Sequence, residues 1–184
     1  MPHIVLFEHE NFSGRRVDIN QCGSSLGRDH NFNDKTSSII VVRGTWLVYA
    51  DGDYNGKCWV LKPGEYPTPG TWGGSHDNIS SLRPVPADKG LPLAVLFGDG
   101  DFNGRMVSFT EANADFPYIG FNDQVSSAII VRGNWSAYRD TNFSGQRWAL
   151  SDKGGPTQNG FYSGPDGFFD NDAISSIRPD SETA

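Results

Sequence analysis

The sequence predicts an all-β protein made of two similar β-sandwich halves, and three observations support that prediction. A short hairpin motif ending in glycine occurs four times along the 184 residues. Runs rich in β-branched residues separate the copies, as in half-buried strands. The counts of 22 Gly and 11 Pro are high for this length, which is typical of many turns between short strands. Any helix should be a short turn near Ser24–Asp29 or Asn113–Tyr118.

Each hairpin copy has an aromatic residue, four further residues, a second aromatic residue, one more residue and a glycine. The copies are Phe7–Gly14, Tyr49–Gly56, Phe97–Gly104 and Tyr138–Gly145. A tight fold-back at this point needs a positive φ, which glycine adopts without a Cβ clash. We therefore expect each glycine at positive φ and each aromatic pair packed around its hairpin.

The four copies form two duplicated halves. Their glycines follow one another at intervals of 42, 48 and 41 residues. Trp46 and Trp135 each lie three residues before the tyrosine of the second hairpin in their half. A single copy is too small to bury its apolar face, so two copies should pair into one sandwich. We expect domains over 1–86 and 91–180, a linker over 87–90 that follows a proline-rich stretch, and a polar tail over 181–184.

Composition excludes several functional classes. The formal charge of -7 makes nucleic acid a poor partner. No apolar run approaches the roughly 20 residues of a transmembrane helix, and the N-terminus lacks the features of a signal peptide, which favours a cytoplasmic location. No catalytic motif appears, so we expect no enzymatic activity. Cys22 and Cys58 lack the spacing of a zinc site, and they are either two thiols or one disulfide.

A second motif follows each hairpin and has the form polar-Asp-x-x-Ser-Ser. Its copies are Asn33–Ser38, His76–Ser81, Asn122–Ser127 and Asn171–Ser176. Calcium takes six to eight oxygen ligands, and such a loop offers a carboxylate, a hydroxyl and unpaired carbonyls. Asp and Ser before a strand also form turns that need no metal. Four copies at the repeat spacing favour calcium loops, and one carboxylate per site predicts affinity on the order of micromolar to tens of micromolar.

Together, the hairpins and loops resemble the βγ-crystallin superfamily over about residues 2–180. The resemblance implies that each half is a Greek-key sandwich of two four-stranded sheets. It also implies up to two Ca²⁺ per domain, shared between paired loops. The implied side-chain ligands are Asp34, Asp77, Asp123 and Asp172 with Ser37, Ser80, Ser126 and Ser175. The implied carbonyl ligands are Lys35, Asn78, Gln124 and Ala173 in the loops, with Glu8, Ala50, Gly98 and Arg139 in the hairpins.

The leading interpretation is a non-enzymatic calcium-binding protein with a structural or stress role, stabilised by calcium. One alternative is an interaction module of a larger protein, such as a pore-forming complex, with a membrane, glycan or protein partner. Trp72 has no counterpart in the other half and could be an exposed contact for such a partner. A lens-type structural protein with little calcium response is the third interpretation. Monomer and homodimer both remain open.

Overall fold

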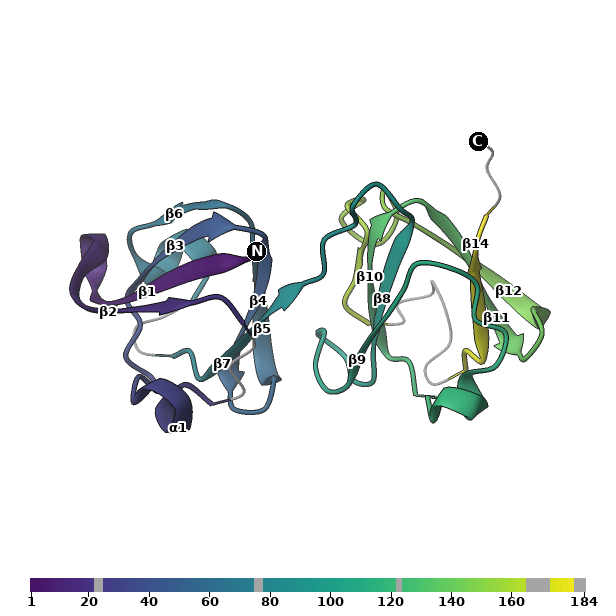
Figure 1. Ribbon diagram of the computed structural model, residues 1–184, viewed down its shortest axis with the longest axis horizontal. Coiled ribbons are helices and arrows are strands. Elements are labelled where there is room, and N and C mark those ends of the chain that lie inside the picture. The colour runs from purple at the N-terminus through teal and green to yellow at the C-terminus, as the bar shows by residue number, and fades with distance from the viewer. Residues whose placement is uncertain (22–24, 75–77, 122–123, 165–172, 181–184) are drawn as a thin grey trace. The chain divides into compact units, whose positions relative to one another are not determined.

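The computed structural model describes residues 1–21, 25–74, 78–121, 124–164 and 173–180. The chain divides into two compact units, Met1–Pro86 and Ala87–Ala184, and each is described by itself (Figure 1). Both consist of short antiparallel strands joined by turns, so the predicted all-β class is confirmed. The short α1 helix (Leu26–His30) and the 3₁₀ turn η3 (Phe116–Ile119) overlap the two regions where helical turns are predicted.

The first unit contains two antiparallel sheets. Its elements are β1 (His3–His9), η1 (Glu10–Phe12), β2 (Ser13–Ile19), α1, β3 (Ser38–Arg43), β4 (Thr45–Asp51), β5 (Asn55–Leu61), β6 (Gly64–Tyr66), η2 (Pro69–Trp72) and β7 (Ser81–Val85). The strand orders are β2-β1-β3-β6 and β5-β4-β7. Because β6 comes from the second hairpin copy but pairs with β3 of the first, the second copy adds a strand to the sheet of the first, as in a Greek key.

The second unit repeats this plan. Its elements are β8 (Leu93–Phe97), β9 (Met106–Phe109), η3, β10 (Ser127–Arg132), β11 (Asn134–Asp140), β12 (Ser144–Ser151), β13 (Phe161–Tyr162) and β14 (Ser176–Pro179). The strand orders are β13-β10-β8-β9 and β12-β11-β14. The strand β13 from the fourth hairpin copy pairs with β10 from the third, so the same crossing of a strand between copies recurs.

The described residues differ from the expectation of two four-stranded sheets per unit in one sheet of each unit. In the described residues, the second sheet of each unit has three strands. In the second unit, the place beside β14 is taken by a single antiparallel bridge between Asn113 and Ile177. Two backbone hydrogen bonds of 2.8 and 2.9 Å join these residues. The third copy therefore contributes one paired residue there instead of a strand.

Each unit has its own apolar core between its two sheets. Alternate residues of β1 and β4, such as Ile4, Leu6 and Trp46, are buried in the first core. Trp135 takes the matching place in the second core, and the indole N–H of each tryptophan donates to a backbone carbonyl at 3.1 Å. Trp72 is 7% exposed and packs into the first core, so the expectation that it could be exposed is wrong. The turn η2 folds it inward although the other half has no counterpart.

The four hairpins share one conformation, as predicted. Their glycines have φ between 75° and 82°. The two aromatic rings of each hairpin lie with centroids 5.5 to 5.9 Å apart, mostly edge to face. A Cβ added to Gly56 or Gly104 would lie 2.4 Å from a carboxylate oxygen of Asp51 or Asp99. Glycine is therefore required both by the backbone angle and by the space available.

Tyr49 of the first unit is buried beside an arginine. Its hydroxyl accepts a hydrogen bond of 3.1 Å from Nε of Arg83, whose side chain also stacks on the ring of Tyr54. Burial raises the pKa of Tyr49, and interaction with Cys58 raises it further, against the opposite effect of Arg83. The neutral phenol is therefore strongly favoured in the folded unit.

We expect this tyrosine to make the protein sensitive to alkali. A raised pKa in the folded state means that stability is fully present below the unfolded pKa of about 10 and declines as pH rises above it. The free energy of unfolding should fall by about 1.4 kcal/mol per pH unit beyond pH 10 through this one group. Comparing urea unfolding of the wild type and Tyr49→Phe between pH 9 and 11.5 isolates its share. Equal slopes for the two proteins would contradict the expectation.

Candidate calcium loops

The fold brings the loops of the first two copies together in the first unit. The hydroxyl of Ser80 donates a hydrogen bond of 2.9 Å to Oδ1 of Asp34, although the two residues lie 46 positions apart. The backbone N–H of Asp34 donates to the carbonyl of Ile79 at 3.1 Å. A carboxylate from one loop and a hydroxyl from the partner loop thus occupy one place, which is the pairing that the resemblance implies.

Asp34 is held in an orientation that leaves its carboxylate in contact with solvent. Its φ is 52°, in the left-handed region that Asp tolerates better than most residues. The side-chain amide of Asn33 donates to its Oδ2 at 2.8 Å. The residue is exposed, whereas Ser80 is buried. An ion arriving from solvent would therefore meet the carboxylate first and the hydroxyl behind it.

The backbone of the first serine of every loop is hydrogen-bonded to the hairpin of its own copy. The backbone N–H groups of Ser37, Ser80, Ser126 and Ser175 donate to the carbonyls of Phe7, Tyr49, Phe97 and Tyr138 at 2.8 to 2.9 Å. The next hairpin residues are the predicted carbonyl ligands, Glu8, Ala50, Gly98 and Arg139. All four buried serines therefore lie beside the hairpin segment that should share a site with them.

The third copy shows the same proximity for two carbonyl candidates. The carbonyl oxygen of Gln124 lies 3.8 Å from the position that a Cβ on Gly98 would occupy.

The guanidinium of Arg139 in the fourth copy donates to Gln146 at 3.2 Å and lies over the Trp148 ring. It is thus held along β12 while the backbone of Arg139 stays in the hairpin.

The described residues include part of the predicted ligand set. Asp77, Asp123 and Asp172 lie outside the described residues, as does Cys22, so the pairing of the two cysteines also stays a prediction. Lys35, Asn78 and Ala173 are described and follow their aspartates in the loops. Within the described part of the chain, no group of three His, Cys, Asp or Glu side chains could hold a metal. The predicted sites are of another kind, with one carboxylate among hydroxyl and carbonyl oxygens.

Sequence reasoning missed the role of the second serine. The hydroxyls of Ser38, Ser81, Ser127 and Ser176 donate to the carbonyls of His9, Asp51, Asp99 and Asp140 at 2.5 to 2.6 Å. The same hydroxyls accept the backbone N–H of Phe12, Tyr54, Phe102 and Phe143 at 3.0 to 3.1 Å. Each second serine therefore closes the hairpin of its own copy. The Ser-Ser pair, which is the same in all four loops, was the feature of the sequence that could have indicated this role.

Thr36 departs from the other loops in a way that predicts a stabilising substitution. It occupies the position of Ile79, Val125 and Ile174, and all four are fully buried. In the described residues, its Oγ1 has no hydrogen-bond partner. Thr36→Val keeps the shape and removes the unpaired hydroxyl, so it should raise the free energy of unfolding by about 1–2 kcal/mol. Chemical denaturation tests this, with Val125→Thr expected to have the opposite effect. A destabilised Thr36→Val protein would contradict the prediction.

Comparison with known proteins identifies the family. The Beta/Gamma crystallin family profile matches residues 3–85 and 94–179, one match over most of each unit. The chain belongs to the beta/gamma-crystallin family. The beta-crystallin B1 of Sus scrofa is 33% identical over 150 residues, which cover 80% of this chain and 59% of that protein. This crystallin thus spans about three fifths of the length of its beta-crystallin B1 relatives.

Two further comparisons agree with the family. A Beta/gamma-crystallin of Ciona intestinalis is 45% identical over 83 residues, which cover 45% of this crystallin and 98% of that protein. The structure of geodin, a beta-gamma crystallin from Geodia cydonium, matches the whole fold with a TM-score of 0.72 at 18% identity, covering 97% and 99% of the two chains. The predicted family and Greek-key fold are therefore confirmed. None of the described helices is long and apolar enough to span a bilayer.

Proposed function

We propose that this crystallin is a non-enzymatic structural protein that binds calcium at its paired loops, with up to two Ca²⁺ in each unit. The contact between Asp34 and Ser80 is the observation that supports it best, since it joins a carboxylate and a hydroxyl from different loops. The acid lies at the surface and the hydroxyl is buried, so the donor set is reached from solvent. Oxygen donors of this mixed kind suit a hard cation such as Ca²⁺.

In each unit, both loops would contribute ligands to each ion. In the first unit, Asp34 and Ser80 would hold one ion together with loop and hairpin carbonyls such as Lys35 and Ala50. Asp77 and Ser37 would serve the second ion in the same manner. The second unit would use Asp123, Ser126, Asp172 and Ser175. The side-chain amide of Asn33 and the anchored backbone of Ser80 keep the first of these donor sets in place before an ion arrives.

Calcium would act by stabilising the fold. The unfolded chain does not assemble oxygens that lie 46 residues apart, so an ion binds the folded form selectively. At a hundredfold excess over the dissociation constant, one independent site adds about 2.7 kcal/mol to the free energy of unfolding. In the presence of calcium, the free energy of unfolding would therefore be higher than packing of the two apolar cores alone provides.

The test is isothermal titration of calcium into the protein after stripping with a chelator. The wild type should bind about four ions per chain, one for each loop, with Kd on the order of micromolar to tens of micromolar. Asp34→Ala should lose one ion and part of the thermal shift. Asp29→Ala is the matched control, because it removes an exposed carboxylate of α1 in the same unit. Absence of saturable binding by the wild type would contradict the proposal.

A lens-type structural role is the second candidate. The 33% identity to beta-crystallin B1 over 80% of the chain favours it. This role would need only a soluble and stable fold. Calcium would then neither bind saturably nor change the melting temperature. The same titration therefore separates the two candidates. A cytoplasmic location, the oligomeric state and any protein, glycan or membrane partner stay predictions.

A further inference from the structure

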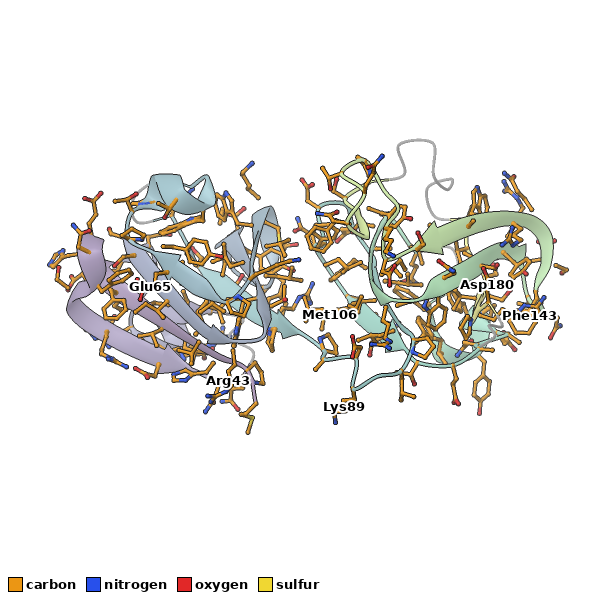
Figure 2. All side chains as sticks on the ribbon, turned by 90° about the horizontal axis from the view of Figure 1, so that it is seen from above. Arg43, Glu65, Lys89, Met106, Phe143 and Asp180 are labelled. Atoms are coloured by element: carbon orange, nitrogen blue, oxygen red, sulfur yellow. The ribbon has the colours of Figure 1, made fainter. Side chains whose placement is uncertain are left out.

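The outer face of the β12-β11-β14 sheet in the second unit carries a polar cavity. Its volume is about 510 Å³, within the range of small-molecule sites. It is lined by Ser136, Tyr138, Arg147, Arg178, Pro179 and Asp180. These residues come from all three strands and the position just after β14, so the cavity is built on the sheet itself and not on a loop. Asp180 is labelled in Figure 2.

On one side of this cavity, the carboxylate of Asp180 contacts a serine hydroxyl and a guanidinium. The buried hydroxyl of Ser136 donates to Oδ1 of Asp180 at 2.6 Å and accepts from Nε of Arg147 at 2.8 Å. A guanidinium nitrogen of Arg147 lies 3.7 Å from Oδ2 of Asp180. The Asp180 backbone N–H is anchored on Asn134 at 2.8 Å. A hydroxyl and a guanidinium are thus arranged around an oxyanion group.

A second guanidinium lines the same cavity. Arg178 donates to the hydroxyl of Tyr138 at 3.3 Å, and the central carbon of its guanidinium, Cζ, lies 4.6 Å from the centroid of the Phe143 ring. Stacking on the ring fixes the guanidinium plane but uses few of its five N–H donors. Arg178 is exposed, whereas Arg83, the equivalent residue of the first unit, is 4% exposed.

Three of the residues that line the cavity differ between the two units. Where the second unit has Ser136, Arg147 and Asp180, the repeat places Leu47, Cys58 and Val85 in the first. The stacked arginine is therefore common to both units and belongs to the hairpin architecture. The second arginine, the serine and the aspartate are additions. With two arginines and one aspartate, the cavity carries a net positive charge in a chain whose formal charge is -7.

We propose that this cavity binds a phosphate monoester. Two guanidinium groups on one sheet face can each give parallel N–H donors to phosphate oxygens, and the hydroxyls of Ser136 and Tyr138 can serve the remaining ones. A doubly charged phosphate gains more than a single carboxylate from two cations, and it can compete with Asp180 for Arg147. The volume leaves room for the organic part of the ester. The ester is either a free metabolite or a lipid headgroup.

The experiment is an NMR titration of the chelator-treated full chain with inorganic phosphate, then with glycerol 3-phosphate. A parallel arm measures sedimentation with phosphatidylcholine vesicles that contain phosphatidic acid. Arg147→Met and Arg178→Met each remove one guanidinium and keep an apolar stem, and each should weaken binding at least about tenfold. Asp180→Asn removes the competing charge and should strengthen binding about fivefold. Arg132→Met, at the exposed end of β10, is the matched control for charge alone.

Saturable shifts of the β11, β12 and β14 amides that follow this pattern would support the proposal. Soluble esters would then be distinguished from a lipid headgroup by the arm that responds. Two results would overturn it: no binding of phosphate, glycerol 3-phosphate or vesicles by the wild type, or binding that Arg132→Met weakens as much as the cavity variants do. Because the two arginine variants are independent, misfolding of one leaves the other as a test. Calcium is absent throughout, so failure here and failure of the calcium loops are distinguishable.

Discussion

Ser81→Ala is expected to lower the free energy of unfolding of the first unit by about 2–4 kcal/mol. The hydroxyl of Ser81 is fully buried and makes two hydrogen bonds to the backbone of its hairpin. Alanine would leave the N–H of Tyr54 and the carbonyl of Asp51 without their partner. An unpaired backbone group costs up to about 1–3 kcal/mol when it is shielded from water, and both of these groups are partly buried, so the loss exceeds that of an ordinary serine. Urea unfolding of the calcium-free protein, followed by tryptophan fluorescence, measures it.

The neighbouring serine is the matched control for this prediction. Ser80 donates its hydroxyl to the exposed Asp34, a group that water can serve instead. Ser80→Ala should therefore cost less than about 1 kcal/mol without calcium while it weakens the response to calcium. The two adjacent serines would thus separate stability from binding. Equal losses for both variants in calcium-free buffer would show that the second serine has no special role.

The repeat explains why so much of the hairpin could be predicted. The position of each glycine follows from a backbone requirement, and the aromatic spacing places both rings on the same side of the fold-back. Such local rules need no knowledge of distant residues. Positive φ at Gly14 and the packing of Phe7 on Phe12 are accordingly confirmed.

Features that depend on residues far apart in the chain were harder to predict. The contact of Asp34 with Ser80 was expected only through the family resemblance, since no local rule pairs residues 46 apart. Trp72 is buried because η2 turns it inward, which the absence of a counterpart could not show. The fourth strand of a sheet shrinks to one bridge at Asn113, because the length of a ladder depends on tertiary packing.

The cavity of the second unit illustrates the same limit. Arg147 and Arg178 are 31 positions apart and look like ordinary surface cations in the sequence. Only strand pairing brings them to one face: Arg147 pairs with Tyr138, and Arg178 pairs with Ser136 on the same central strand. Neither arginine belongs to the hairpin motif or to the loop motif of the sequence. Charge gathered across a sheet is therefore a feature that must be found in the structure.

Trp46→Ala should be the most damaging single substitution in the first unit, at about 3–5 kcal/mol. The side chain is fully buried in the first core, and its indole N–H donates to the carbonyl of Arg43 at 3.1 Å. Alanine removes the ring, leaves a cavity and deprives that carbonyl of a donor. Calorimetry and urea unfolding of the variant should agree on the loss.

Two substitutions sharpen this last prediction. Trp46→Phe keeps an aromatic ring but removes the N–H donor, so it should cost clearly less than alanine. Trp135→Ala is the equivalent change in the second core, with the same 3.1 Å hydrogen bond to a backbone carbonyl. Because burial and bonding match, the two alanine variants should lose similar free energies, each in its own unit. A loss below about 1 kcal/mol for either would mean that the core relaxes around the missing ring.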